Sequence, residues 1–256
     1  MNFTIFFHIA FMGEIERVFK EMIETIKESQ ILDSCSSITL NLATDSQADD
    51  MRIDLDGIKC KCFLNRSTLA EAEFPTIRLL TQHSMDNPGE AVLYIHSKGV
   101  SKSNECIDDW RRYMMHFNVT KWKDCLKVLS NGSDTCGVDW SGWPMPHYSG
   151  NFWWAKTDYI NKIGSVDDVN LTPSEAPLIG RHKAEMWIGT GEGWHKNLHS
   201  SNIPVLERHL HRYPEEKYNC RFCFGTRWVM VNDGDDPDVP CERCNPDGKL
   251  SHFGGV

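Results

Sequence analysis

The sequence lacks several features that would identify a function at once. It has no glycine-rich phosphate loop of either common type, which argues against a Rossmann dehydrogenase and a P-loop nucleotidase. It has no Gly-x-Ser-x-Gly elbow, the mark of an α/β-hydrolase. It has no basic block, and its formal net charge is -9. Nucleic-acid binding is therefore disfavoured, because binding to phosphates needs a surplus of lysine and arginine on one face.

A membrane span and an export signal are also missing. The apolar opening over residues 1–13 is too short to cross a bilayer, and it lacks the positive flank and cleavage site of a signal peptide. We therefore expect a cytoplasmic protein whose ten cysteines are mostly reduced. Paired cysteines are then interpreted as metal ligands before disulfides.

The sequence does contain a globular composition and a cysteine-rich end. Its 256 residues are 40% hydrophobic and 25% charged, which suits one large domain or one domain with a small appendage. Two Cys-x-x-Cys pairs lie about seventeen residues apart, Cys220 with Cys223 and Cys241 with Cys244. Each such turn presents two sulfurs on one side of a knuckle, and zinc prefers four thiolates in a tetrahedron.

We therefore predict a structural zinc ribbon in a tail over residues 214–256, behind a main domain over residues 1–213. Residues 226–231 are expected to form a hairpin strand, followed by a polar loop. Because so short a tail buries little core, metal binding would be its main source of folding free energy. Two disulfides or redox-active cysteine pairs are the alternatives. The compartment disfavours the first, and the spacing of the two knuckles disfavours the second.

The first hundred residues have the alternation of an α/β protein. Residues 3–9 form a short apolar run, residues 14–29 repeat apolar side chains at spacings of three and four, and residues 37–43 are strand-like. A strand, a helix and a strand in this order predict a right-handed βαβ unit, and hence a parallel sheet. Three further elements are expected, a strand over 59–64, a helix over 74–85 and a strand over 90–95.

The strand over residues 90–95 runs directly into the turn of residues 96–99, His-Ser-Lys-Gly. Because open α/β sheets bind ligands at the carboxyl ends of their strands, this turn is a candidate binding site. After it we expect a helix over residues 106–129, an irregular tryptophan-rich segment over residues 137–155, and a short helix over residues 180–189.

Four ordered motifs resemble those of a known family. YIHSKGVS, DWRRYM, HYSGNFWWAKTDYI and RHKAEMWIG are similar to segments of GT-A-type glycosyltransferase-like proteins of bacteria, large viruses and phages, which are related to rhamnan-synthesis proteins. The resemblance covers roughly residues 1–200 and leaves out the cysteine tail. It implies a GT-A fold, an α/β/α sandwich. It also implies an enzyme of polysaccharide biosynthesis that moves a hexosyl or deoxyhexosyl group from a nucleotide-sugar donor to a glycan or other hydroxyl acceptor. For a viral member the location would be the host cytoplasm.

The resemblance also implies a donor site after the strand over residues 90–95. Most members of this fold carry Asp-x-Asp there, which holds a divalent metal on the donor diphosphate. Here the position is His96-Ser97-Lys98, so dependence on Mn²⁺ or Mg²⁺ is left open. Lys98, assisted by Arg111 or the adjacent arginine, is the candidate for neutralising phosphate charge, since such clamps serve the same purpose as a metal. His96 is a candidate for binding phosphate, the sugar or a metal, and Ser97 is a further candidate for the donor phosphates.

Sugar transfer by inversion also needs a general base for the acceptor hydroxyl, and a carboxylate suits that role. By analogy with the acidic residue that heads a late helix in this fold, Glu185 is the first candidate and Asp139 the second. The structural alternative for Glu185 is a helix-terminal charge or a salt bridge to Arg181. His8, at the end of the first strand, is expected to border the nucleotide pocket.

An aromatic turn is expected to form the floor of the sugar or acceptor pocket, because aromatic rings stack on sugars and amides hydrogen-bond to hydroxyls. Its candidates are Gly150, Asn151, Trp153, Trp154 and the preceding His147. The alternative is that at least one of the two tryptophans belongs to the core. His195 and His199, four residues apart, are candidates to share a helix face as metal ligands, with ordinary surface histidines as the alternative.

Three functions are consistent with these features. The first is a glycosyltransferase. The second is a carbohydrate- or nucleic-acid-binding module that keeps the scaffold without turnover, and the missing Asp-x-Asp favours it. The third is a zinc-ribbon adaptor for which the α/β body is a platform. The donor and acceptor of the first would be a nucleotide sugar and a glycan-type hydroxyl compound.

Overall fold

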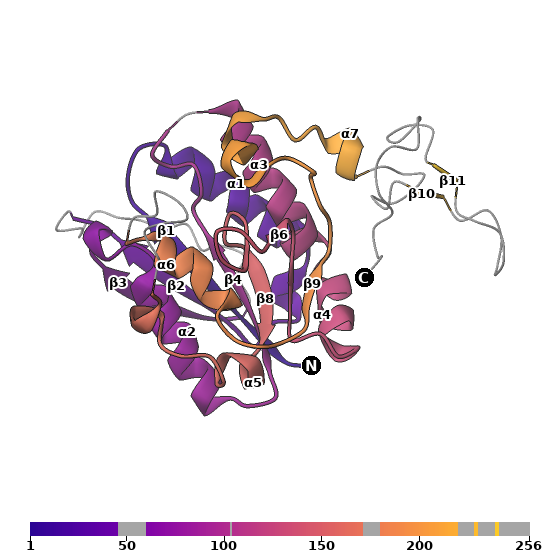
Figure 1. The fold of residues 1–256 in the computed structure, drawn as a ribbon. Coiled ribbons are helices and arrows are strands. Elements are labelled where there is room, and N and C mark those ends of the chain that lie inside the picture. Colours follow the sequence, from indigo (N-terminus) through magenta and orange to yellow (C-terminus); the bar gives the residue numbers. More distant parts are fainter. Residues whose placement is uncertain (46–59, 103, 171–179, 220–227, 230–238, 241–256) are drawn as a thin grey trace.

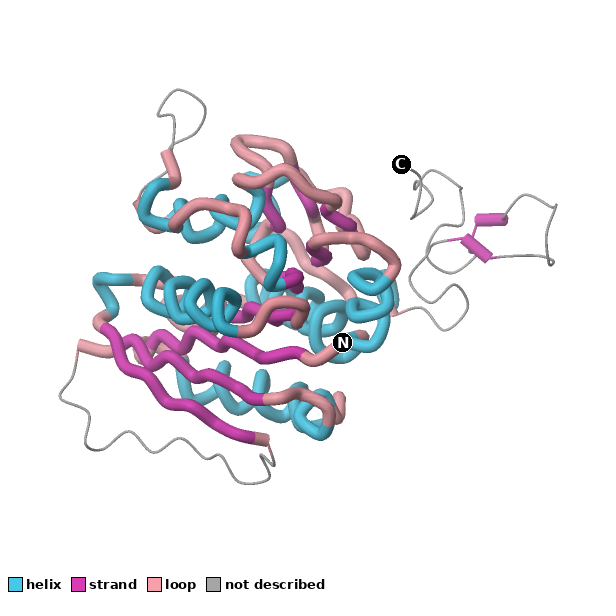
Figure 2. Tube along the Cα trace, turned by 90° about the horizontal axis from the view of Figure 1, so that it is seen from below, coloured by secondary structure: helices cyan, strands magenta, loops and turns pink. Residues whose placement is uncertain are grey.

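The computed structural model describes residues 1–45, 60–102, 104–170, 180–219, 228–229 and 239–240. These residues form an α/β fold in which helices cover both faces of a central sheet (Figures 1 and 2). The predicted fold class is therefore confirmed.

The described residues build a sheet of seven strands in the order β3-β2-β1-β4-β8-β5-β9. The first four strands in the chain are parallel to one another, whereas β8 runs antiparallel to both β4 and β5. The strands are β1 (Phe3–Ala10), β2 (Ser37–Ala43), β3 (Lys61–Ser67), β4 (Ala91–His96), β5 (Thr135–Gly137), β8 (Trp153–Lys156) and β9 (His195–Asn197).

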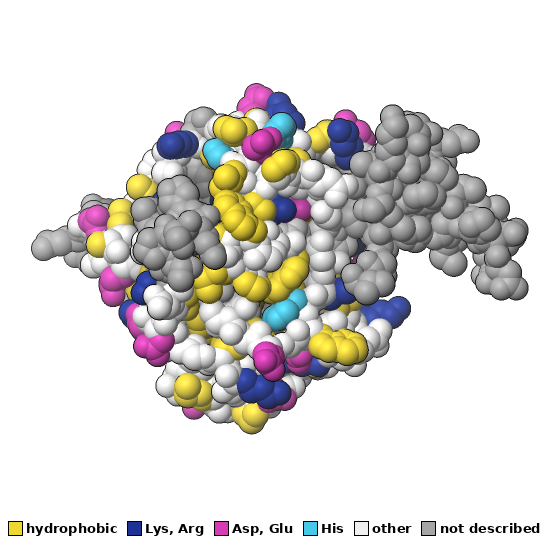
Figure 3. Space-filling view, in the orientation of Figure 1, with side chains coloured by type: hydrophobic (Ala, Val, Ile, Leu, Met, Phe, Trp, Pro, Cys, Tyr) yellow, Lys and Arg dark blue, Asp and Glu magenta, His cyan; other side chains and the backbone are white. Residues whose placement is uncertain are grey.

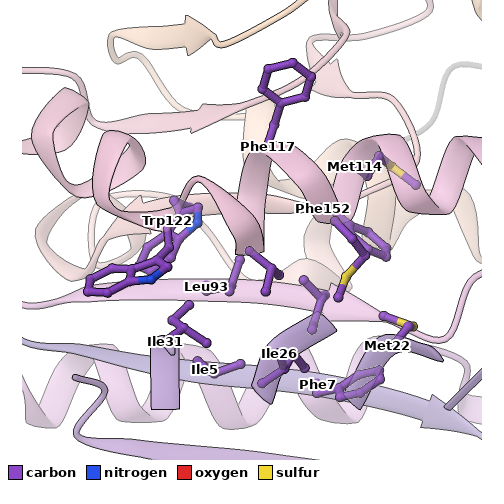
Figure 4. Close-up of a cluster of buried hydrophobic side chains, with 14 of the residues drawn as sticks. Ile5, Phe7, Met22, Ile26, Ile31, Leu93, Met114, Phe117, Trp122 and Phe152 are labelled. Carbon is purple, nitrogen blue, oxygen red and sulfur yellow. The ribbon is translucent and has the colours of Figure 1, made fainter. Parts of the chain in front are cut away.

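Successive side chains of the central strands point to opposite faces of the sheet, and both faces are buried. In β1, Phe3, Ile5 and Phe7 join one hydrophobic cluster, and Phe6 joins the other. Figure 4 shows part of the first cluster, where Ile5 and Phe7 meet residues of the adjacent helix. This double burial explains why β1 is an almost continuous apolar run.

The helices divide between the two faces according to these clusters. The first face is covered by α1 (Ile15–Glu28), α3 (Glu105–Met115) and α4 (Trp122–Ser130). The second is covered by α2 (Phe74–Asp86), α5 (Thr157–Ile160) and α6 (His182–Met186). His8 and His96 have even numbers in β1 and β4, so they lie on the face that α2 covers.

The remaining described elements are short. They are the hairpin of β6 (Trp140–Ser141) and β7 (His147–Tyr148), the helix α7 (Glu215–Tyr218), the paired strands β10 (Trp228–Val229) and β11 (Val239–Pro240), and 3-10 turns over 31–33, 69–71, 166–168, 187–189 and 205–210.

Residues 106–129 are helical as expected, but the structure divides them into two α-helices. A π-helical turn over His116–Thr120 separates α3 from α4. At this turn the side chain of Asn118 donates a hydrogen bond of 3.0 Å to the Met114 carbonyl, which widens the local hydrogen-bonding pattern.

The cysteine tail falls mostly outside the described residues. All four predicted zinc ligands, Cys220, Cys223, Cys241 and Cys244, lie there, so the zinc site stays a prediction. The antiparallel pairing of β10 with β11 agrees with the strand that was expected over residues 226–231. The helix α7, just past the expected boundary at residue 213, still packs on the main domain through the ring of Tyr218.

In the part of the chain that the structure describes, every helix is too short or too polar to cross a membrane.

Candidate functional site

The candidate site lies where the direction of strand order reverses. From β1 the chain builds β2 and β3 on one side, and then crosses to place β4 on the other side of β1. Open α/β sheets bind ligands outside the carboxyl ends of the strands at such a switch point. In the registers of β1 with its neighbours, His8 is paired with Asn41 of β2 and with His96 of β4. Two histidines therefore flank the switch point.

A carboxylate at the start of α2 lies near these histidines. Glu73 immediately precedes α2, and its Oε2 accepts hydrogen bonds from the Tyr94 hydroxyl (2.7 Å) and from Nδ2 of Asn151 (2.6 Å). Its Oε1 lies 3.8 Å from Nδ1 of His96, and the carboxylate is 23% exposed. Burial opposes ionisation of Glu73, but His96, His8 and the two hydrogen-bond donors together lower its pKa.

Burial lowers the pKa of both histidines of the cluster. Burial lowers the pKa of His8 from 6.5 to about 4, and its Nδ1 lies 2.9 Å from the Thr76 hydroxyl. Burial also lowers the pKa of His96, against the opposing attraction of Glu73. Because the carbonyl of Gly150 can only accept, Nε2 of His96 carries the proton in their 2.9 Å hydrogen bond. Nδ1 of His96 therefore faces Glu73 as the site for a second proton.

Gly150 joins this cluster to the predicted base. Its amide donates a 2.7 Å hydrogen bond to Oε1 of Glu185, which lies in α6. The glycine has a φ of +91°, and a Cβ there would stand 2.5 Å from Sδ of Met114. Only glycine fits this turn without movement, so the backbone link from His96 to Glu185 depends on it.

Lys98 supplies the positive charge of the site. Its Nζ lies 4.0 Å from the centre of the Trp110 ring. Burial lowers the pKa of Lys98, while Glu185 and Glu73 attract the ammonium and raise it, in that order of strength, and Arg181 lowers it. Among the described residues, no carboxylate forms a close ion pair with this ammonium. A partly buried cation without a close counter-ion is suited to an anionic ligand.

Two predicted phosphate ligands instead support the turn. Arg111 is completely buried, and its guanidinium donates to the Lys98 carbonyl (2.8 Å), Asp108 (2.8 Å) and Glu21 (3.0 Å). The Ser97 hydroxyl accepts a hydrogen bond of 2.8 Å from the amide of Ala10. These contacts fix the backbone of the turn and leave the charge of Arg111 balanced by carboxylates.

The aromatic turn is largely core. Trp153 and Trp154 are fully buried, which corrects the expectation that their faces line a sugar pocket. Asn151 is also buried, at a φ of +61°, and its amide bridges Glu73 and the Trp153 indole. The rings of these two tryptophans contribute buried area to the hydrophobic core and expose none of it to a ligand. Asn151 therefore orients Glu73 instead of presenting its amide to solvent.

His147 lies close to the site but is buried. Its Nδ1 donates a hydrogen bond of 2.8 Å to the Met145 carbonyl. Burial lowers its pKa, and Glu185 is the strongest opposing influence. The ring is therefore a neutral neighbour of the Glu185 carboxylate.

Asp139, the second candidate base, is held in the interior by hydrogen bonds to neighbouring residues. Its carboxylate is fully buried and accepts hydrogen bonds from the amide (2.6 Å) and the hydroxyl (2.9 Å) of Ser201, with Arg208 at 3.7 Å. A carboxylate with these partners is already neutralised and shielded from an acceptor hydroxyl. Of the two candidates, Glu185 alone is joined to the switch-point cluster by a hydrogen bond that the structure gives.

The expected helical pair of histidines is corrected by the structure. His195 begins the strand β9 and stacks on Trp140 at 4.3 Å, whereas His199 follows the strand and lies 2.9 Å from the Tyr113 hydroxyl. In a strand, residues four apart do not meet as they do on a helix. Within the described ranges, no three His, Cys, Asp or Glu side chains are grouped to hold a metal ion.

Glu73 is the residue that the sequence analysis missed. The helix over residues 74–85 was predicted, and a helix that follows a parallel strand begins at the carboxyl edge of the sheet. That edge is where His96 was already placed. The position of Glu73 before Pro75 could therefore have indicated a carboxylate at the site.

A cavity adjoins the cluster on the β2 side. It has a volume of about 310 Å³ and is lined by Asn41, Asn65, Arg66, Pro75, Arg78, Leu79 and Gln82. Asn41 stands beside His8 in the sheet, and its buried Oδ1 has no hydrogen-bond partner among the described residues. The cavity and the cluster thus share one edge of the sheet.

The face drawn in Figure 3 has hydrophobic side chains near its middle and charged side chains mostly around its edge.

Comparisons with known proteins give a family and a remote structural likeness. Among curated protein sequences, none matches the chain. Among solved structures, the chain resembles S. aureus TarS (residues 1–349), with 9% identity and a TM-score of 0.39 over 91% of this chain and 76% of that one. This likeness is too remote to argue from, and the fold class rests on the sheet and helices themselves. The model of a family described as a domain of unknown function (DUF8361) matches residues 5–192, so the chain belongs to this family.

Proposed function

We propose that this protein is a glycosyltransferase that moves a sugar from a nucleotide-sugar donor to a hydroxyl of a glycan-type acceptor. The observation that carries the proposal is the pair of opposite charges at the switch point. The ammonium of Lys98 and the carboxylate of Glu185 attract each other there without a close ion pair. The four sequence motifs supply these residues and support the same function.

In this proposal Lys98 binds the donor diphosphate. Its ammonium has three N–H donors, and it stabilises the negative charge that develops on the leaving diphosphate as the bond to the sugar breaks. Arg111 acts indirectly, because its hydrogen bond of 2.8 Å to the Lys98 carbonyl holds the turn that carries the lysine.

Glu185 is the proposed general base. The acceptor oxygen forms a bond to the anomeric carbon, its proton passes to the Glu185 carboxylate, and the nucleoside diphosphate leaves with the electron pair of the broken bond. The hydrogen bond from the Gly150 amide to Oε1 orients the carboxylate and leaves Oε2 for the proton.

The cavity beside His8 is the proposed place for the nucleoside. Asn41 and Asn65 offer amide groups for a base or ribose. The guanidinium of Arg78, which also lines the cavity, is paired with Asp167 at 2.6 Å. A nucleoside in this cavity would direct its diphosphate along the same sheet edge toward Lys98. An Asn41→Leu variant should then weaken nucleoside diphosphate binding more than it weakens binding of inorganic pyrophosphate.

The experiment is an assay of the purified full chain with a panel of nucleotide sugars, which records donor hydrolysis, transfer and shifts in melting temperature. We expect Lys98→Ala to lower kcat/KM at least about a hundredfold, and Glu185→Gln to lower kcat with little change in donor affinity. Lys123→Ala is the matched control, because Lys123 also lies over a tryptophan, Trp122, at 5.4 Å. If no donor is bound or turned over, the proposal fails.

One observation favours a second function, a sugar- or nucleotide-binding protein without turnover. The position of the usual Asp-x-Asp is His96-Ser97-Lys98, and the hydroxyl of Ser97 is used by the Ala10 amide. Donor binding that Lys98→Ala abolishes, without any hydrolysis or transfer by the unmodified protein, would support this function over catalysis.

A further inference from the structure

The contact between Lys98 and Trp110 is extended by a second aromatic residue, Tyr213. Trp110 of α3 is 7% exposed, and its ring lies 4.0 Å from the Lys98 ammonium. Tyr213 stacks on Trp110 with the ring centres 6.2 Å apart and the planes 8° from parallel. The three side chains form a stack that runs from the switch point to the segment after β9.

The segment that carries Tyr213 is fastened to α3 by charge. Arg212 forms ion pairs with Asp109 and with Glu105, the latter at 2.5 Å. Tyr213 itself is 5% exposed and also packs on Tyr113, with ring centres 5.1 Å apart. The orientation of Tyr213 against Trp110 is therefore fixed from two sides.

A cation over an aromatic face is held without being neutralised. The ring attracts the ammonium electrostatically but accepts no strong hydrogen bond from it, whereas a carboxylate partner would compete with a phosphate. The groups around Lys98 are Trp110 on α3, Glu73 at α2 and His96 at the end of β4. On α6 and at its start they are Glu185, Arg181 and His182. Trp110 is thus the contact that fixes the position of the ammonium and leaves its N–H groups for an anion.

We propose that Trp110 and Tyr213 are positioning residues that hold Lys98 ready for the donor diphosphate. The inference rests on the proposed function and extends it. Tyr213 lies beyond residues 5–192, the part that the family model matches, so the segment after β9 contributes to the site although it is outside the family match.

The experiment measures binding of UDP, GDP and inorganic pyrophosphate to the full chain by calorimetry. We expect Trp110→Leu to weaken binding about tenfold, Trp110→Phe to weaken it about threefold or less, and Tyr213→Leu to fall between them, since a cation–π contact is worth about 0.5–2 kcal/mol. Tyr213→Phe should bind normally, because the stack needs the ring and not the hydroxyl. Trp110→Phe and Tyr213→Leu keep the inference testable if Trp110→Leu does not fold.

A double-mutant cycle separates positioning from a general structural effect. If Trp110 acts through Lys98, Trp110→Leu should weaken binding no more than about twofold once Lys98 is already alanine. Equal weakening by Trp110→Leu in both backgrounds would overturn the inference. Trp194→Leu is the control for loss of an indole, because Trp194 is 76% exposed and outside the stack.

A second measurement is independent of the proposed function. Acylation of Lys98 by an amine-reactive ester, quantified by peptide mass spectrometry relative to Lys102, needs no ligand. Removal of the stack in Trp110→Leu or Tyr213→Leu should raise the rate at Lys98 at least about threefold, because the amine is uncovered and loses its preference for the charged form. An unchanged rate would overturn the positioning role. If the rate rises but no diphosphate binds the unmodified protein, the proposed function fails while the positioning role stands.

Discussion

At the scale of single residues, Gly150 combines three constraints. Its amide donates to Glu185, its carbonyl accepts from His96, and its φ of +91° lies in the left-handed region. The space where a Cβ would stand is occupied by Met114 at 2.5 Å and Trp110 at 3.1 Å. A side chain at this position would therefore disturb both the hydrogen-bonded link and the tryptophan beneath Lys98.

We expect Gly150→Ala to reduce the free energy of unfolding by about 3 kcal/mol, from backbone strain and overpacking together. The matched control is Gly89→Ala. Gly89 has a φ of +78° but nothing within 4 Å of the added Cβ, so it should lose only about 1 kcal/mol. Urea unfolding of both variants measures the difference, and equal losses would show that Met114 and Trp110 accommodate the methyl group.

His8 is a single residue that should make stability depend on pH. Burial disfavours the charged ring and lowers the pKa of His8 from its ordinary value of 6.5 to about 4 in the folded protein. Between these values the unfolded chain binds more protons, so the free energy of unfolding falls as the pH drops from 6.5 to 4. The loss assigned to His8 alone is about 3 kcal/mol by pH 4.

We therefore expect His8→Gln to be less sensitive to acid than the unmodified protein, by about 3 kcal/mol between pH 7 and pH 4. Urea unfolding at several pH values measures this. His209→Gln, a change at an exposed histidine, is the control. If His8→Gln and the unmodified protein lose the same free energy, the pKa of His8 does not differ between the folded and unfolded states.

At the scale of elements, two neighbouring arginines of α3 contact the same carboxylate of α1. Arg111 is fully buried and pairs with Glu21 at 3.0 Å, while Arg112 has a side chain that is 50% exposed and pairs with the same residue at 3.0 Å. Arg111 also reaches the Lys98 carbonyl in the turn after β4. The buried arginine thus ties together α1, α3 and the strand that ends at the site.

Removal of these two arginines should differ strongly in effect. Arg111→Ala leaves Glu21 and Asp108 without their buried partner, and we expect a loss of about 3–5 kcal/mol in the free energy of unfolding. Arg112→Ala should lose less than about 1 kcal/mol, because exposed pairs are screened by water. Chemical denaturation measures the free energy of unfolding of both variants. Similar losses would contradict the prediction that the buried Arg111 contributes more to stability than the exposed Arg112.

At the scale of the whole molecule, the cysteine tail and the α/β body are expected to differ in their dependence on metal. The purified chain should contain about one zinc ion, and Cys223→Ser or Cys241→Ser should abolish it. Cys62→Ser is the control, because Cys62 is an exposed cysteine of β3 outside the two pairs. Elemental analysis measures the zinc. Zinc that persists in both tail variants would place the metal elsewhere.

Much of the body could be predicted from local pattern. The strands β1 and β2 and the helices α1 and α2 begin and end within about two residues of the expected positions, because their apolar periods are clear and uninterrupted. The division of residues 106–129 could not be predicted, since its apolar spacing continues through the π-helical turn that Asn118 stabilises.

The residues of the candidate site were predicted only in part, because burial and pairing depend on distant residues. The sequence indicated His96, Lys98 and Glu185, but it gave no sign that Arg111 is buried or that Asp139 is already paired. Burial and pairing depend on residues far away in the chain, which a local pattern does not reveal.

The sequence alone therefore determined the α/β class and the turn at the end of β4, because hydrophobic period and strand-end position are local properties. It also carries the prediction of zinc at the four cysteines, which lie outside the described residues. Only the tertiary structure decided which charges remain without close partners. It brought Glu73 to His96 across 23 residues, and Tyr213 to Trp110 across 103. Contacts between residues so far apart in the chain form when the helical layers pack on the sheet. They produce no periodic pattern in the sequence from which they could be predicted.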